Sequence, residues 1–173
     1  MDDSGRERER QKSLTGYGVL DTPNELQFDA IVKDAARILG TPIALISLVD
    51  EHRQWFKAKI GLEATQTPRS ISFCTHAIHG SEVMVVQDAT MDDRFAANPL
   101  VTGDLGIRFY AGAPLKTDDG KRIGTLCVID TKPHPRGLPE KDRAALESLA
   151  RRTMHALELR RSMLNDQQSG TPR

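Results

Sequence analysis

The chain has 173 residues and a mass of 19.2 kDa, a size that suits one folded domain with short extensions. Hydrophobic residues make up 38% and charged residues 28%, which supports a packed core and excludes intrinsic disorder. The 24 basic residues equal the 24 acidic ones, so no net charge draws the protein to nucleic acid or to an acidic membrane. Two cysteines are too few for a disulfide-stapled secreted scaffold, and no apolar run approaches the ~18 residues of a membrane span. We therefore expect a cytoplasmic location.

A charged tail and an amphipathic helix are the first predicted elements. Residues 1–16 are rich in alternating charges, and we expect a flexible tail there. The segment Thr22–Glu25 then matches a capping box with proline at the first helical position. Apolar residues recur at helical spacing from Phe28 to Leu39, and Gly40 predicts the end of the helix.

Two strands and an irregular segment come next. The apolar run Ile43–Val49 predicts a central strand covered on both faces. In Trp55–Ile60 polar and apolar residues alternate, which predicts the second arm of a hairpin with one wetter face. Within residues 62–106 we expect a short helix beginning at Ser72 and a strand over Val83–Val86.

A second hairpin and a final helix complete the chain. The strand-like runs Arg108–Lys116 and Arg122–Asp130 are joined through a turn at Gly120, and Pro114 predicts a local edge or bulge. A helix begins near Pro139 and carries one apolar stripe, with the polar residues 162–173 forming a tail. Leu159 and Met163 lie off that stripe, where they can contact a partner.

This element order predicts an α+β fold. Its antiparallel sheet has the N-terminal and C-terminal helices on one face and a loop-roofed pocket on the other. Six separated segments resemble bacterial GAF domains, namely Tyr17–Pro23, Ala44–Asp50, Gln54–Lys57, Ser72–Ile78, Phe109–Leu115 and Gly124–Asp130. The resemblance spans residues 17–161 and is closest to GAF units found ahead of histidine kinases and diguanylate cyclases. It implies a PAS-like sheet, a ligand cavity and terminal helices that form a homodimer.

The resemblance and the lack of catalytic motifs predict a sensor that is not an enzyme. We expect it to bind an unidentified small molecule, with no cofactor identified, and to signal through its terminal helices. Only about a dozen residues follow the last helix, too few for an output domain. We therefore expect either an output partner in trans, such as a histidine kinase or cyclase, or a chain that is a fragment of a larger sensor.

Six residues are predicted to contact the ligand because they offer polar groups and aromatic walls below the roof. They are Phe73, Cys74, His76, Asp88, Arg108 and Tyr110. Alternatively, Arg108 and Asp88 form an ordinary ion pair, and Tyr110 is a core residue. Gly112 and Gly124 leave space either for a ligand or for close packing of a helix.

The cysteines leave other functions open. Cys74, His76 and His79 could ligate a metal, but helical spacing places Cys74 on a different face from the two histidines, so we expect no metal site. Cys74 and Cys127 could form a thiol-based redox sensor, although the alternation of its strand groups Cys127 with packed residues. Further alternatives are an enzyme similar to methionine sulfoxide reductases and an interaction scaffold with a vestigial pocket.

Overall fold

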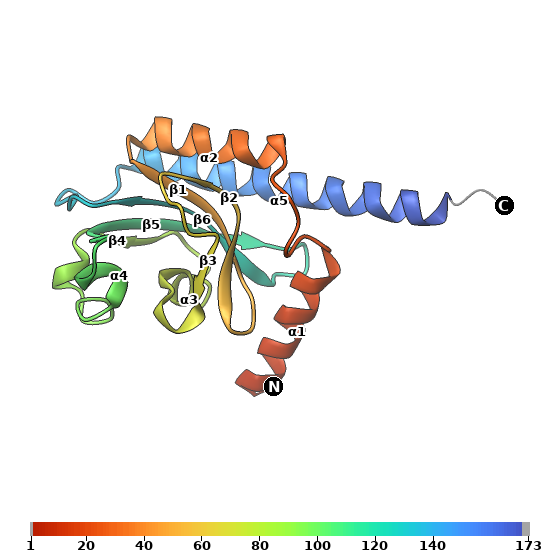
Figure 1. The fold of residues 1–173 in the computed structure, drawn as a ribbon, viewed down its shortest axis with the longest axis horizontal. Coiled ribbons are helices and arrows are strands. Elements are labelled where there is room, and N and C mark those ends of the chain that lie inside the picture. The colour runs from red at the N-terminus through yellow and green to blue at the C-terminus, as the bar shows by residue number, and fades with distance from the viewer. Residues whose placement is uncertain (1, 171–173) are drawn as a thin grey trace.

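A six-stranded antiparallel sheet separates two layers in the computed structural model, which describes residues 2–170 (Figure 1). The strand order is β3-β2-β1-β6-β5-β4. The strands are β1 (Ile43–Val49), β2 (Arg53–Ile60), β3 (Gln66–Pro68), β4 (Met84–Val86), β5 (Phe109–Lys116) and β6 (Arg122–Asp130). The α-helices are α1 (Asp3–Gly16), α2 (Leu26–Leu39), α3 (Phe73–Ala77), α4 (Pro99–Thr102) and α5 (Glu140–Ser169), and the 3-10 helices are η1 (Arg69–Ile71) and η2 (Ala89–Met91). The predicted α+β fold is confirmed.

Both predicted hairpins are present. Strand β1 pairs with β2 and also with β6, so the apolar run of β1 lies near the middle of the sheet and is buried along its whole length. Strands β5 and β6 are joined by a turn in which Gly120 has φ +81°, a conformation that glycine adopts without steric cost. Strand β4 pairs with β5 only as far as Gly112, which leaves Pro114 on a local edge, as predicted.

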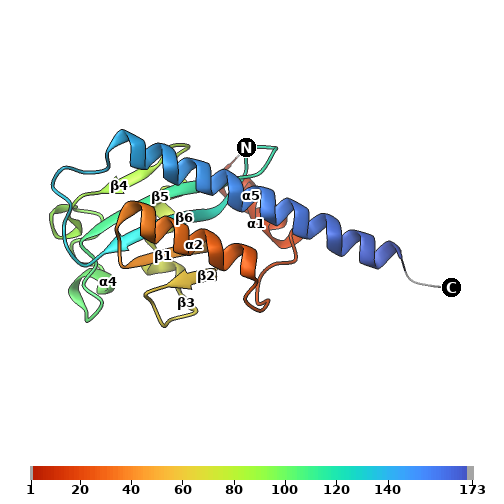
Figure 2. The same ribbon diagram turned by 90° about the horizontal axis from the view of Figure 1, so that it is seen from above.

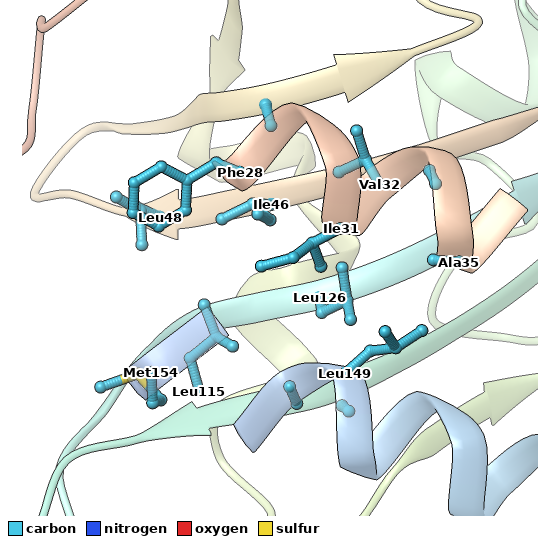
Figure 3. Close-up of a cluster of buried hydrophobic side chains, with 14 of the residues drawn as sticks. Phe28, Ile31, Val32, Ala35, Ile46, Leu48, Leu115, Leu126, Leu149 and Met154 are labelled. Atoms are coloured by element: carbon cyan, nitrogen blue, oxygen red, sulfur yellow. The ribbon is translucent and has the colours of Figure 1, made fainter. Parts of the chain in front are cut away.

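The two long helices lie side by side on one face of the sheet, as Figure 2 shows from above. Their apolar faces and the sheet enclose one of two cores, shown in Figure 3. In this core Ile46 and Leu126 project from the sheet toward Phe28 and Ile31 of α2 and Leu149 of α5. Both helices therefore bury their apolar faces against the sheet, as predicted.

The start of α2 differs from the prediction. Gly40 ends the helix with φ +66°, as expected, but Glu25 at the N-cap makes no capping hydrogen bond. Thr22 donates instead to the Val19 carbonyl, and the Glu25 carboxylate binds Lys57 and Arg160. The predicted capping box is wrong, because Lys57 and Arg160 bind the Glu25 carboxylate that the motif would use as a cap.

The wetter face predicted for β2 is also wrong. Lys57 is fully buried, and its ammonium donates to the Thr22 hydroxyl at 2.8 Å and to the Pro23 carbonyl at 2.7 Å. Across the sheet Ile46 faces Ala58 while Ser47 faces Phe56, so a bulge interrupts the alternation at Lys57. Burial of this ammonium is tolerated because every contact is a charge-assisted hydrogen bond.

The two predicted tails contain helix. Residues 3–16 form α1, in which Leu14 is buried and Arg10 reaches the Arg122 carbonyl at 3.4 Å. Helix α5 continues through residues 162–169, and Figure 1 shows this end projecting beyond the sheet. Residues 1 and 171–173 of the predicted tails lie outside the described part of the chain. Ion pairs at i,i+3 spacing, Arg6–Asp3 and Arg10–Glu7, support the helix in residues 3–16.

The opposite face of the sheet carries the second core. Short helices and loops between β3 and β5 cover it, with side chains such as Phe73, Phe95 and Tyr110 packed beneath them. Among the helices of residues 2–170, none has the length and apolarity needed to cross a membrane.

Candidate functional site

Helix α3 positions the chemically reactive part of the second core. Ser72 caps it by accepting a hydrogen bond from the Thr75 amide at 3.1 Å, as the sequence predicted. Its inner face carries Phe73, Cys74 and Ala77, which pack against the sheet, while His76 lies on the exposed side. The helix contacts β1, β5 and β6, so Cys74 points at the centre of the sheet.

Cys74 is surrounded by polar side chains from three strands. Its Sγ lies 3.0 Å from Thr125 Oγ1, and the Tyr110 hydroxyl donates to Sγ at 3.3 Å. Interactions with the Cys127 and Ser47 side chains also lower the pKa of Cys74. We call Ser47, Cys74, Tyr110, Thr125 and Cys127 the thiol cluster. All five side chains are buried.

Strand register explains why these residues converge. Thr125 and Cys127 are two positions apart on β6 and share a face, and Ser47 of β1 stands opposite Thr125. Gly112 of β5 stands opposite Cys127, and a Cβ at Gly112 would lie only 2.2 Å from the Tyr110 hydroxyl oxygen. The missing side chain at Gly112 therefore lets the Tyr110 ring fold over its own strand toward Cys74.

The two cysteines are electrostatically unequal. Burial raises the pKa of the Cys74 thiol, but interactions with the polar side chains of the thiol cluster stabilise its thiolate, and the net pKa is below the ordinary value. The hydrogen bond to Cys74 raises the pKa of Cys127 well above its usual value, and burial adds to the rise. Burial and the charge of Cys74 likewise raise the pKa of Tyr110, which keeps its hydroxyl a donor. Cys74 is thus the thiol that ionises first.

A buried amide extends the hydrogen-bond network toward β3. Gln54 Oε1 accepts from the Ser47 hydroxyl at 3.1 Å and from the Ser72 hydroxyl at 2.8 Å, while its amide donates to Thr67. The N-cap of α3 is therefore connected to the thiol cluster through Gln54 and Ser47.

Four of the six predicted ligand residues lie close together. Phe73 lies 5.3 Å from Tyr110 between ring centroids and stacks on Phe95 at 4.0 Å, and His76 meets the edge of Phe95 at 5.0 Å. Cys74 joins this group through Tyr110. Burial and then the charge of Arg94 lower the pKa of His76, which favours the neutral ring.

The other two predicted residues lie elsewhere. Asp88 accepts hydrogen bonds from the amide and hydroxyl of Thr90, at 3.0 and 2.6 Å, and so caps η2. Arg108 donates to the Val101 carbonyl at 2.9 Å and to the Ile107 carbonyl at 3.0 Å. Both side chains serve local backbone structure, and the predicted ligand site stays a prediction for the group around Phe73.

Separate surface hollows adjoin these residues. His76 lines one of about 480 Å³ together with Arg69, Ser72 and Thr75. Asp88 lines another of about 430 Å³ beside β4. The hollow at His76 lies over the N-cap of α3 and is the opening nearest in sequence to Cys74.

A metal ion has no matching ligand set in the part of the chain that the structure describes. Cys74 is buried whereas His76 and His79 are exposed, so the three side chains do not share a face of α3. Within residues 2–170 no group of three or more His, Cys, Asp or Glu side chains is arranged to hold a metal.

Two members of the thiol cluster, Ser47 and Thr125, had no role predicted from the sequence. Cys74 and Cys127 were considered as a redox pair, with Cys127 favoured as a packed residue. A signal for Ser47 and Thr125 was present, because each is a hydroxyl residue inside an otherwise apolar buried strand. The pairing of the strands that carry them was not available from that pattern.

Comparison with known proteins identifies the family. A family model for the GAF domain matches residues 24–157, most of the chain. The chain belongs to the GAF family. Solved structures agree in fold: the GAF domain of an Acinetobacter phosphoenolpyruvate-protein phosphotransferase is 17% identical, with a TM-score of 0.63 and full coverage of both chains. A free methionine-R-sulfoxide reductase from Neisseria meningitidis is 20% identical, with a TM-score of 0.64 over 94% of this chain and 95% of that one.

A curated relative is much closer in sequence. A protein of Pseudomonas aeruginosa named a cyclic di-GMP phosphodiesterase is 49% identical over 157 residues, which are 90% of this GAF chain. The match spans only 26% of that relative's length. The prediction of a signalling domain that is not an enzyme is wrong, because this relative is named as an enzyme. The predicted kinase or cyclase partner stays a prediction. The only enzymes predicted as alternatives from the sequence were methionine sulfoxide reductases; no phosphodiesterase was among them.

Proposed function

We propose that this chain acts in the hydrolysis of cyclic di-GMP, as the GAF unit of a phosphodiesterase. The observation that carries the proposal is the 49% identity to the P. aeruginosa enzyme over 90% of the chain. The aligned segment includes the whole GAF family match. Identity at this level supports the view that this chain is the corresponding GAF unit of the same kind of enzyme. The proposal concerns a part of such an enzyme, since the match covers 26% of the relative.

In this role the GAF unit adjusts the rate of hydrolysis in response to a small molecule. The group formed by Phe73, Cys74, His76 and Tyr110 is the proposed place of input, because α3 carries three of them and is held to the sheet mainly by that packing. A five-residue helix has few hydrogen bonds of its own, so it moves at low cost when its contacts change. We place the chain in the cytoplasm, where a reducing environment maintains its two free thiols.

The test is a chimeric enzyme. The matched 157-residue segment of the P. aeruginosa relative is replaced by this chain, and hydrolysis of cyclic di-GMP is followed by chromatography of the products. We expect a rate close to that of the parent. The matched control carries the Acinetobacter GAF domain, which has the same fold but 17% identity, and we expect its rate to differ from the parent's. A folded chimera that hydrolyses no cyclic di-GMP would contradict the proposal.

We also propose that two copies of the chain pair through α2 and α5. A groove of about 470 Å³ runs between these helices and is lined by Ile31, Leu159 and Met163. Leu159 and Met163 of α5 are 56% and 57% exposed. Exposed apolar side chains in one groove are better explained by a partner helix than by scattered surface residues.

A further inference from the structure

The thiol cluster contains the components of a reversible redox site. Two free cysteines lie in the same buried core, one on α3 and one on β6. Cys74 Sγ lies 3.0 Å from Thr125 Oγ1, and Cys127 is two positions from Thr125 on the same face of β6. A packed structural thiol needs no such partner, whereas a thiol oxidised to a disulfide needs a second sulfur beside it. The tyrosine and threonine hydroxyls at 3.3 and 3.0 Å add hydrogen bonds that a merely apolar core would not provide.

We propose that Cys74 and Cys127 form an intramolecular disulfide when the protein meets a peroxide. Cys74 is the attacking thiol, and Cys127 resolves the product. This inference goes beyond the phosphodiesterase role and does not depend on it, because this chain alone carries both sulfurs.

The chemistry balances with the peroxide as the only oxidant. The Cys74 thiolate attacks one peroxide oxygen, so that an S–O bond forms and the O–O bond breaks. The departing hydroxide takes up the proton that Cys74 lost on ionising and leaves as water. The Cys127 sulfur then attacks Cys74 Sγ, the S–S bond forms, the S–O bond breaks, and the hydroxyl leaves with the Cys127 proton as a second water. Two thiols lose two electrons in total, and hydrogen peroxide gains them.

The hydrogen bonds assign the two roles. Cys74 Sγ accepts a hydrogen bond from the Tyr110 hydroxyl and lies 3.0 Å from Thr125 Oγ1, and these contacts favour its ionised form. Cys127 stays protonated until the sulfenic acid on Cys74 has formed, and loss of the negative charge on Cys74 then removes one cause of its raised pKa. The order of ionisation is therefore the order of reaction.

Access to Cys74 requires movement of α3. The thiol is 2% exposed, but its cover is a helix of five residues. At the C-terminal end of α3, the Arg122 guanidinium donates a hydrogen bond to the Ile78 carbonyl. Before its N-terminal end, the side-chain amide of Asn98 donates to the Ile71 carbonyl at 3.0 Å. Hydrogen peroxide is scarcely larger than water, so a local opening of this cover is sufficient.

Intact mass spectrometry of the full chain tests the proposal. Reduced protein is treated with hydrogen peroxide, denatured in N-ethylmaleimide and weighed. We expect a monomer two hydrogens lighter that accepts no maleimide, and full maleimide labelling after dithiothreitol. Two labelled thiols after peroxide treatment of the native protein, when the same protein oxidises in urea, would overturn the proposal. A disulfide between two chains would overturn it as well.

Substitutions separate the roles. In Cys127→Ser we expect a sulfenic acid on Cys74 that dimedone traps, and in Cys74→Ser no dimedone adduct on Cys127. Tyr110→Phe keeps the ring and removes the hydroxyl that donates to Cys74. At a pH below the Cys74 pKa we expect the variant to oxidise about threefold more slowly. Fewer Cys74 thiolates form, and this loss outweighs the greater nucleophilicity of each thiolate. Equal dimedone labelling of the two cysteine variants would overturn the assignment of roles, and thermal melting checks that each variant is folded.

Discussion

At the scale of single residues, two glycines have roles that the sequence did not distinguish. The sequence left open whether Gly112 and Gly124 make room for a ligand or for a helix. In the structure Gly112 makes room for the Tyr110 ring, and a Cβ at Gly124 would lie 2.0 Å from the backbone oxygen of Ser47 on β1. Backbone of a central strand cannot move away as a flexible side chain can.

We therefore expect Gly124→Ala to lower the free energy of unfolding by about 3 kcal/mol, measured by urea denaturation. The matched control is Gly16→Ala at the end of α1, where no atom lies within 4 Å of the added carbon. We expect the control to change stability by less than about 1 kcal/mol. Equal losses in the two variants would show that the contact with Ser47 is unimportant.

At the scale of elements, α1 is attached to the domain by buried Leu14 and by charged contacts. Glu7 receives two hydrogen bonds of 2.9 Å from the guanidinium of Arg10, and Arg69 of η1 contacts the same carboxylate at 2.5 Å. Arg10 holds the pKa of Glu7 well below its usual range. Because the folded pKa is the lower one, this stabilisation is complete above the ordinary carboxyl range and is lost as the pH falls through the lowered pKa.

Glu7→Gln should loosen α1 without unfolding the sheet. We expect amide exchange in residues 3–16 to become about fivefold faster, corresponding to ~1 kcal/mol for a carboxylate that is partly exposed. Glu9→Gln on the same helix is the control. Among the ion pairs of the described residues, Glu9 takes part in one, with the Lys121 ammonium at 3.5 Å. Uniformly faster exchange throughout the domain would mean that α1 is part of the global folding unit.

At the scale of the whole molecule, α5 extends well past the body of the domain. It has 30 residues, so its length is about 45 Å, and its C-terminal end projects beyond the sheet (Figure 1). Its C-terminal third carries the exposed Leu159 and Met163. If two copies pair there, a charge at Met163 is buried on association. Met163→Glu should weaken the dimer at least about tenfold, measured by light scattering across a concentration series.

Asn165→Glu adds the same charge at an exposed position on another side of α5 and should leave the dimer intact. A wild-type protein that stays monomeric at every concentration would contradict the dimer.

Local patterns in the sequence were sufficient to predict most elements of this protein. Helix α2 with its end at Gly40, both hairpins, the cap of α3 at Ser72 and the placement of the long helices on one face follow from periodicity, turn residues and caps. These signals act over a few residues, so they can be detected without knowing which segments meet. The GAF resemblance has the same origin, since it rests on short segments in a given order.

Only the tertiary structure decided where the chemistry lies. The bulge that buries Lys57, the attachment of α1 through Glu7 and Arg69, and the separation of Asp88 from the other predicted ligand residues depend on contacts between distant segments. The thiol cluster joins residues 47 to 127 through the register of three strands and the packing of one short helix. A one-residue shift of register would point those side chains away from Cys74, and no local pattern specifies that register.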